Sequence, residues 1–156
     1  MLFPPHQATT LAGLGSAAML AGAFGFQWIG GMAPCQLCLW QRWPHAAAVL
    51  VLLTLTLTGW RWLAWAGAAA ALATAAIGLF HAGVEQGWWT FVSSCTSGSL
   101  SGLSGASLID PTVAAPAPVR CDQIPWSMFG ISMAGWNAVI STALAALWLI
   151  GTRRKA

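Results

Sequence analysis

The chain has 156 residues, of which 58% are hydrophobic and only 6% are charged. This small number of charged side chains cannot cover the surface of a soluble domain of this size. The composition therefore excludes an ordinary soluble enzyme and predicts a membrane protein. The net charge of +3 is modest, and we expect no nucleic-acid partner.

Four apolar windows approach the roughly 20 residues that a helix needs to cross a bilayer. They cover residues 8–29, 43–59, 62–83 and 128–151. The first window has no Lys or Arg before it and exceeds the apolar core of a signal peptide, so we expect it to remain as a helix. Pro44 lies at the beginning of the second window. Because proline is tolerated in the first turn of a helix, we interpret it as a helix start. The prediction is one all-α domain over residues 1–156, a bundle of four transmembrane helices.

The basic residues predict the orientation of this bundle. One side has Arg61, Arg153, Arg154 and Lys155. The other side has only Arg42 and Arg120. By the positive-inside rule both termini are cytoplasmic, and the loops at residues 30–42 and 84–127 face outward. These two loops contain all four cysteines, which places the thiols in an oxidising compartment.

Tryptophan usage is unusual, with 11 Trp and no Tyr. Most of the tryptophans lie at window ends, as in the aromatic belts of membrane proteins. The inner interface is predicted to be marked by Trp60, Trp62, Trp65 and Trp148. Trp136 lies well inside the fourth window, so we expect it to pack within the bundle or to line a ligand.

Small residues recur every four positions and predict the faces on which the helices pack. In the first, third and fourth windows these residues are Ala17, Ala21 and Gly25; Ala66, Ala70, Thr74, Gly78 and Ala82; and Ala134, Ala138, Thr142 and Ala146.

The sequence PCQLCLWQR, residues 34–42, places Cys35 and Cys38 in a C-x-x-C motif that is followed by Arg42. A two-residue loop gains little stability from closure, and the same spacing occurs in redox motifs where the thiolate reacts. If a helix starts here, Arg42 lies one turn after Cys38 and over the thiol. Both the cation and the helix N-terminus would then favour a thiolate. The alternative is an arginine that only marks the headgroup level.

The second cysteine pair, Cys95 and Cys121, brackets a Ser-, Gly-, Pro- and Ala-rich stretch of the outer loop. The pair forms either a structural or a redox-active disulfide. We expect no metal, because the chain lacks the second close pair of ligands that a four-cysteine zinc site requires.

Two further polar features lie near the outward edge of the windows. His81 and Glu85 are four residues apart at the end of the third window, at the depth of Arg42. They form either a functional pair or a satisfied interfacial hydrogen bond. His45 lies in the first turns of the second window and could face the bundle.

These stretches, CQLCLWQR, HAGVEQGWW and CDQIPWSMFGISMAGWN, together with the Cys95/Cys121 pair, resemble the DsbB (disulfide bond formation protein B) family over essentially the whole chain. The resemblance implies an inner-membrane enzyme with periplasmic cysteine loops. Such an enzyme reoxidises a periplasmic DsbA-like dithiol oxidase and passes two electrons to a membrane quinone, ubiquinone or menaquinone.

The resemblance also implies a role for each cysteine. Cys95 is attacked by the partner's thiolate and Cys121 is released. Cys121 then attacks Cys35, which forms an inter-loop disulfide and expels Cys38. The Cys38 thiolate finally donates to the quinone.

Two more residues are implied to bind the quinone. Arg42 would polarise a quinone oxygen and stabilise the thiolate, and His81 falls where family members place a residue near the quinone. Gln41 departs from the pattern, because some members have an acid at this position.

Three alternatives remain. The same chemistry could serve a dedicated partner other than a DsbA-like oxidase. The chain could instead be a non-enzymatic membrane bundle with two structural disulfides. A quinone reductase of the vitamin K epoxide reductase type is also a four-helix C-x-x-C membrane enzyme, but that family places the motif near its last span, whereas here it precedes the second.

Overall fold

The computed structural model describes residues 4–91 and 119–153. These residues form four helices and one short hairpin. The elements are α1 (Pro5–Trp28), α2 (Gln36–Thr58), α3 (Leu63–Glu85), β1 (Ser127–Met128), β2 (Ile131–Ser132) and α4 (Met133–Gly151). The predicted all-helical fold is confirmed for this part of the chain, while Cys95 lies outside the described residues.

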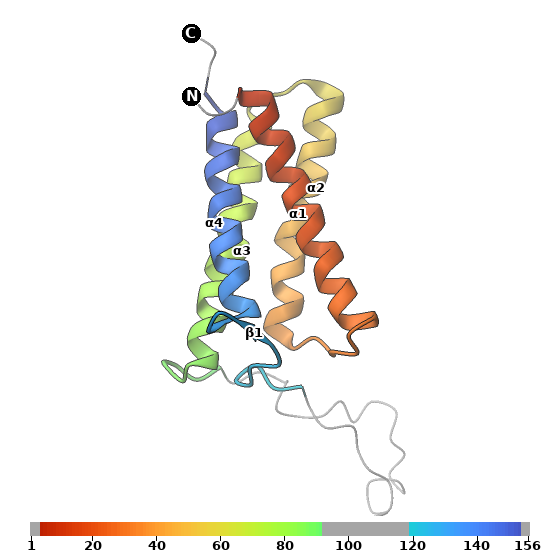
Figure 1. The fold of residues 1–156 in the computed structure, drawn as a ribbon. Coiled ribbons are helices and arrows are strands. Elements are labelled where there is room, and N and C mark those ends of the chain that lie inside the picture. Colours follow the sequence, from red (N-terminus) through yellow and green to blue (C-terminus); the bar gives the residue numbers. More distant parts are fainter. Residues whose placement is uncertain (1–3, 92–118, 154–156) are drawn as a thin grey trace, which may run out of the picture.

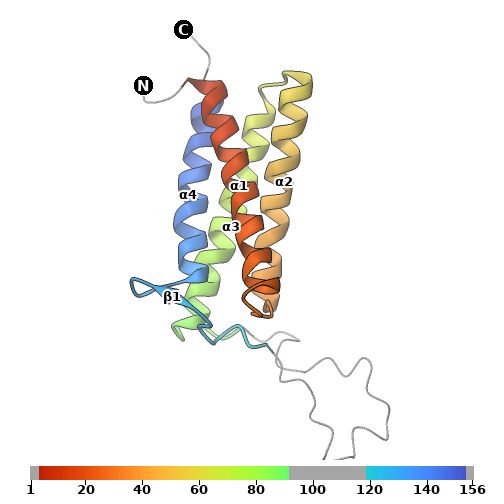
Figure 2. The same ribbon diagram turned by 45° about the vertical axis from the view of Figure 1, so that its right-hand side comes forward.

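The four helices lie side by side as an up-and-down bundle, as both views show (Figure 1, Figure 2). α3 packs against α2 and α4, and α1 packs against the same two helices. α1 begins and α4 ends at one end of the bundle, and the β1–β2 hairpin lies at the other (Figure 1). The start of α2, with the C-x-x-C motif, is therefore at the hairpin end.

Among the described residues, α1, α3 and α4 are long and apolar enough to cross a membrane. α2 is as long, with 23 residues, but its first turns contain Gln41, Arg42 and His45 and lower its mean hydropathy. The membrane crossing of α2 stays a prediction, and so does the orientation of the bundle.

The start of α2 differs from the expectation. The helix begins at Gln36, so Pro44 lies inside it and not at its first turn. Cys35 caps the helix: its sulfur accepts a hydrogen bond from the backbone N–H of Cys38, which satisfies a donor that a helix start leaves open. The interpretation of Pro44 as a helix start was wrong because a hydropathy window omits the polar turn that precedes the apolar run.

The packing faces predicted from four-residue spacing are only partly correct. On α3, Thr74 and Gly78 are buried as expected. On α4, however, Thr142 and Ala146 are exposed. The buried face of that helix is formed by Ala134, Asn137, Ser141, Leu144, Ala145 and Trp148. On α1, Ala21 is likewise exposed. Small residues lie on every side of these helices, so their spacing alone does not identify the packed side.

Trp148 is the largest fully buried side chain, with 0% of its surface exposed. Its predicted role as an interface anchor was therefore wrong, whereas Trp60, Trp62 and Trp65 are exposed as an aromatic belt requires. The indole of Trp148 packs on Gly67 of α3, where an added Cβ would lie 2.4 Å from the ring. Only glycine allows the two helices to approach this closely.

Gly67→Ala should lower the free energy of unfolding by about 1–3 kcal/mol, because the ring of Trp148 has no space to move away. Thermal unfolding in detergent measures the change. Gly25→Ala is the matched control, because an added Cβ on this α1 glycine has nothing within 4 Å and alanine favours a helix. Equal stability of the two variants would contradict the tight contact.

Candidate active site

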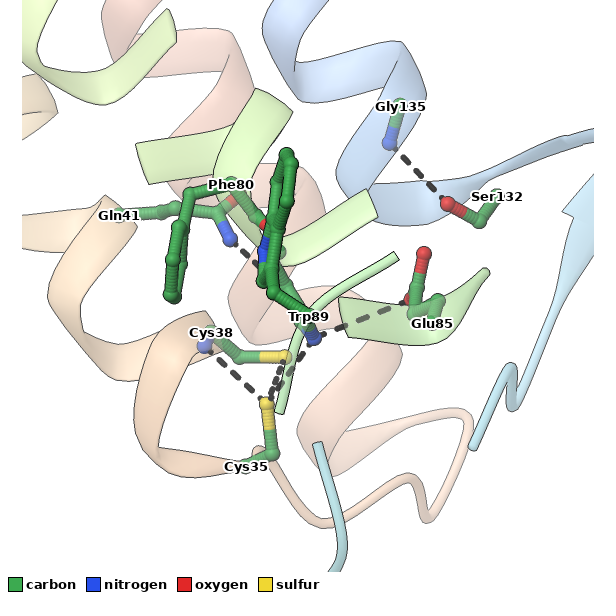
Figure 3. A network of polar contacts seen from close by, with 9 residues as sticks. Cys35, Cys38, Gln41, Phe80, Glu85, Trp89, Ser132 and Gly135 are labelled. Atoms are coloured by element: carbon green, nitrogen blue, oxygen red, sulfur yellow. Dashed lines mark hydrogen bonds and ion pairs between the residues drawn. The ribbon is translucent and has the colours of Figure 1, made fainter. Parts of the chain in front are cut away.

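The two thiols of the C-x-x-C motif lie against each other at the start of α2. Cys35 Sγ donates a hydrogen bond to Cys38 Sγ over 2.9 Å, and Figure 3 shows the two sulfur atoms facing each other. Both residues precede the apolar window at 43–59. The hydrogen bond and burial raise the pKa of the Cys35 thiol. The same hydrogen bond lowers the pKa of Cys38 to about 7, so Cys38 is the more acidic thiol of the pair.

This asymmetry predicts how the reduced protein reacts with an alkylating reagent. Cys38 should be alkylated with a rate that rises with pH around a midpoint near 7, because the thiol below that pH is unreactive and the thiolate above it reacts. In Cys35→Ala the donor is lost, so the midpoint should shift upward. Mass spectrometry of the labelled peptides measures both rates, and an unshifted midpoint would show that Cys35 does not set the pKa of Cys38.

His81 of α3 lies directly beside this dithiol. Its Nε2 is 3.6 Å from Cys35 Sγ and 3.8 Å from a carboxylate oxygen of Glu85. The side chains of His81 and Glu85 are only 4% and 2% exposed. His81 and Glu85 are thus close to each other, as the sequence spacing predicts, and they lie beside the thiols.

Gln41 holds the imidazole of His81 in place. Its side-chain nitrogen is 2.9 Å from His81 Nδ1, and Gln41 is buried. With the amide as the donor, the ring proton lies on Nε2, the nitrogen that faces Cys35 and Glu85. Gln41 thus offers His81 a hydrogen-bond donor, whereas the acid that some family members have at this position would offer an acceptor when ionised.

Cys121 lies in the same buried cluster as the dithiol, although it comes from the far end of the second outer loop. The cluster contains Cys35, Leu37, Val84 and Cys121, with Cys38 packed against it. Only 5% of Cys121 is exposed. The fold thus brings one member of the second cysteine pair to the first pair.

Arg42 is oriented by α1 and not by Cys38. Its terminal nitrogens donate to Gln27 Oε1 at 2.6 Å and to the carbonyl of Ala23 at 3.3 Å, and its guanidinium lies 4.8 Å from the centre of the Phe24 ring. The hydrogen bonds of the guanidinium thus go to α1, while its charge still lowers the pKa of Cys38, as expected of a cation near the thiol.

A cavity of about 430 Å³ connects these groups, within the usual size range of ligand sites. Its walls come from α1, α2, α3, α4 and the segment before β1. Cys35, Cys38 and Trp136 line it. Trp136, which was expected to pack within the bundle or to line a ligand, thus faces a cavity between the helices. Three buried polar atoms of cavity residues have no hydrogen-bond partner among the described residues: Arg42 Nε, His45 Nδ1 and Glu85 Oε2.

The donor atoms of Cys35, Cys38 and His81 lie within 4.8 Å of one another, a spacing that a soft metal ion could also use. The sequence predicts no metal here, and a closed structural zinc site takes four protein ligands. Metal analysis of the purified protein tests this prediction directly, with less than one equivalent of zinc expected.

A helical bundle with three helices that could span a membrane, and with a buried dithiol on an apolar cavity, has the features of a membrane thiol oxidoreductase. The family model described as "Disulfide bond formation protein DsbB" matches residues 5–151. The chain therefore belongs to the DsbB family of membrane disulfide bond formation proteins, and the resemblance seen in its motifs is confirmed. No match was found among the curated proteins or among the solved structures.

Sequence reasoning missed the polar contacts between helices. Gln27 on α1 binds Arg42, and Asn137 on α4 binds His45 at 2.9 Å. A signal was available, because polar side chains inside apolar windows are rare and are functional more often than not. Their partners could not be read from the sequence, since these contacts join residues 15 and 92 positions apart.

Proposed function

We propose that this protein is a thiol:quinone oxidoreductase of the bacterial inner membrane, which reoxidises a periplasmic DsbA-like dithiol oxidase. One observation supports the proposal most strongly. The Cys35–Cys38 dithiol lines a cavity between the helices and also packs in one cluster with Cys121. This arrangement supports an exchange of the dithiol with a loop cysteine and with a ligand bound between the helices.

The exchange begins in the outer loop. The partner's thiolate attacks Cys95 of a Cys95–Cys121 disulfide and forms a mixed disulfide, and Cys121 leaves as a thiolate. Cys121 then attacks Cys35 of the oxidised C-x-x-C pair, the Cys35–Cys38 bond breaks, and Cys38 leaves as a thiolate. The charge of Arg42 lowers the pKa of Cys38. This favours the step, because the more acidic thiol is the better leaving group.

The remaining steps release the oxidised partner and restore the disulfide of the outer loop. The second thiolate of the partner completes the partner's own disulfide and releases Cys95. Cys95 attacks Cys121, which restores the loop disulfide and leaves Cys35 and Cys38 reduced. The two electrons and two protons of the partner dithiol are then held by the C-x-x-C pair.

The residues around the cavity fit a quinone headgroup. Most of the wall is apolar, and the Nε–H of Arg42 is a buried donor without a partner in the described part of the chain. We assign the headgroup contact to Arg42 and His81. When bound, the quinone accepts the two electrons and two protons of the reduced Cys35–Cys38 pair.

Turnover by the purified protein tests the proposal. In detergent, with a reduced DsbA-type dithiol and a short-chain ubiquinone or menaquinone analogue, we expect catalytic formation of quinol with one partner disulfide per quinol. An absence of turnover with both quinone types and several dithiol partners would instead favour a structural bundle with two disulfides.

A further inference from the structure

Within this proposed function, we propose that His45 distinguishes the reduced from the oxidised ligand. Its Nδ1 accepts a hydrogen bond from a hydroxyl of the bound quinol, a bond that a quinone carbonyl cannot make. The inference concerns a buried histidine to which the exchange steps above assign no role.

The tautomer of His45 follows from the hydrogen bonds around it. Asn137 Nδ2 lies 3.2 Å from the backbone carbonyl of Thr74, and a carbonyl can only accept. The side-chain amide of Asn137 therefore points its nitrogen at Thr74 and its oxygen at His45. Because Asn137 Oδ1 must accept, His45 Nε2, at 2.9 Å, must carry the ring proton.

A second carbonyl fixes the same network. The hydroxyl of Thr74 donates to the backbone carbonyl of Gln41 at 3.2 Å, so its oxygen is the acceptor for Asn137 Nδ2 at 3.1 Å. Gly78 makes the approach possible, because a Cβ there would lie 2.9 Å from the Asn137 nitrogen. Three helices thus place the proton of the neutral imidazole of His45 on Nε2.

In this tautomer Nδ1 has a bare lone pair. His45 is 3% exposed and lines the cavity, and its Nδ1 has no partner within residues 4–91 and 119–153. A buried acceptor left without a donor is unfavourable, because it has given up its hydrogen bond to water. A donor on a ligand in the cavity would recover that free energy, and a quinol hydroxyl is such a donor.

His45 and Arg42 offer opposite hydrogen-bonding groups from the same helix. Arg42 Nε is a donor, which suits a carbonyl oxygen, and His45 Nδ1 is an acceptor, which suits a hydroxyl. His45 is seven residues after Cys38 on α2, about 10 Å deeper along the helix. The third unpartnered cavity atom, Glu85 Oε2, belongs to the group beside the thiols.

Tighter binding of the quinol raises the reduction potential of the bound quinone. A tenfold preference corresponds to about 30 mV for a two-electron couple. His45 would therefore favour the transfer of electrons out of the Cys35–Cys38 pair.

The test compares binding of decylubiquinone and of its quinol to the purified protein without oxygen. His45→Gln is the informative variant, because its amide nitrogen can reach the position of Nε2 and keep the bond to Asn137, while Nδ1 and its lone pair are removed. We expect about tenfold weaker quinol binding, quinone binding within twofold of wild type, and an unchanged unfolding temperature. Ser141→Ala is the matched control, since Ser141 is buried 3.5 Å from His45 Nε2 but does not line the cavity.

A measurement on the wild type keeps the inference testable if His45→Gln fails to fold. The dimethyl ether of the quinol has no donor and should bind about tenfold more weakly than the quinol. Equal binding of ether and quinol, or equal loss of quinone and quinol affinity in His45→Gln, would overturn the role of His45 alone. If the wild type bound neither quinone nor quinol, the proposed function would fail together with this inference.

Discussion

Cys38→Ala should abolish quinone reduction, lowering turnover by at least about a thousandfold, since it removes the reacting thiolate. The first half of the exchange should survive, because Cys95 and Cys121 are unchanged. The variant should therefore still form a mixed disulfide with the reduced partner. Quinol formation and non-reducing electrophoresis measure the two halves separately.

The matched control for this variant is Leu39→Ala, which changes the neighbouring, partly exposed residue of the same helical turn. It should turn over at nearly the wild-type rate. Normal turnover by Cys38→Ala would show that electrons leave through another sulfur.

Arg42→Ala should raise the KM for quinone by about 10- to 100-fold, the loss expected for a hydrogen bond from a charged donor. The kcat should fall much less, because Cys38 receives its hydrogen bond from Cys35. Gln27→Ala should shift KM in the same direction by a smaller factor, since Gln27 holds the guanidinium at 2.6 Å. Initial rates over a range of quinone concentrations measure these constants.

Arg61→Ala is the control for charge, because Arg61 binds the carbonyls of Gly151 and Arg153 at the opposite end of the bundle. Its KM should equal that of the wild type. A fall in kcat with an unchanged KM in Arg42→Ala would show that the guanidinium acts on the thiolate and not on the quinone.

Much of the architecture was predictable, because membrane helices are long apolar runs that hydropathy detects directly. The windows at 8–29 and 62–83 lie within one to three residues of the ends of α1 and α3. The starts of α2 and α4 were displaced by several residues. Polar residues of α2 precede its apolar run, and the β1–β2 hairpin occupies the beginning of the last window.

Local spacing also predicted part of the site. The four-residue steps from Cys38 to Arg42 and from His81 to Glu85 each fall within one helix, where such residues share a face. The link between Gln41 and His81 joins two helices and depends on how they pack. The hydrogen-bond partners of Arg42 were not predictable for the same reason: they are on α1, and a helical repeat contains no information about a neighbouring helix.

Trapping the disulfides during the exchange distinguishes the proposed path from a protein with two independent cysteine pairs. Oxidised wild-type protein is mixed with one equivalent of a reduced partner whose second cysteine is replaced by alanine, so that the mixed disulfide cannot be resolved. Quinone and oxygen are left out, and free thiols are alkylated before peptide mapping. The account predicts a Cys35–Cys121 disulfide, a mixed disulfide at Cys95 and alkylation of Cys38. An intact Cys35–Cys38 disulfide with alkylated Cys121 would show that the two cysteine pairs do not exchange, and would contradict the account.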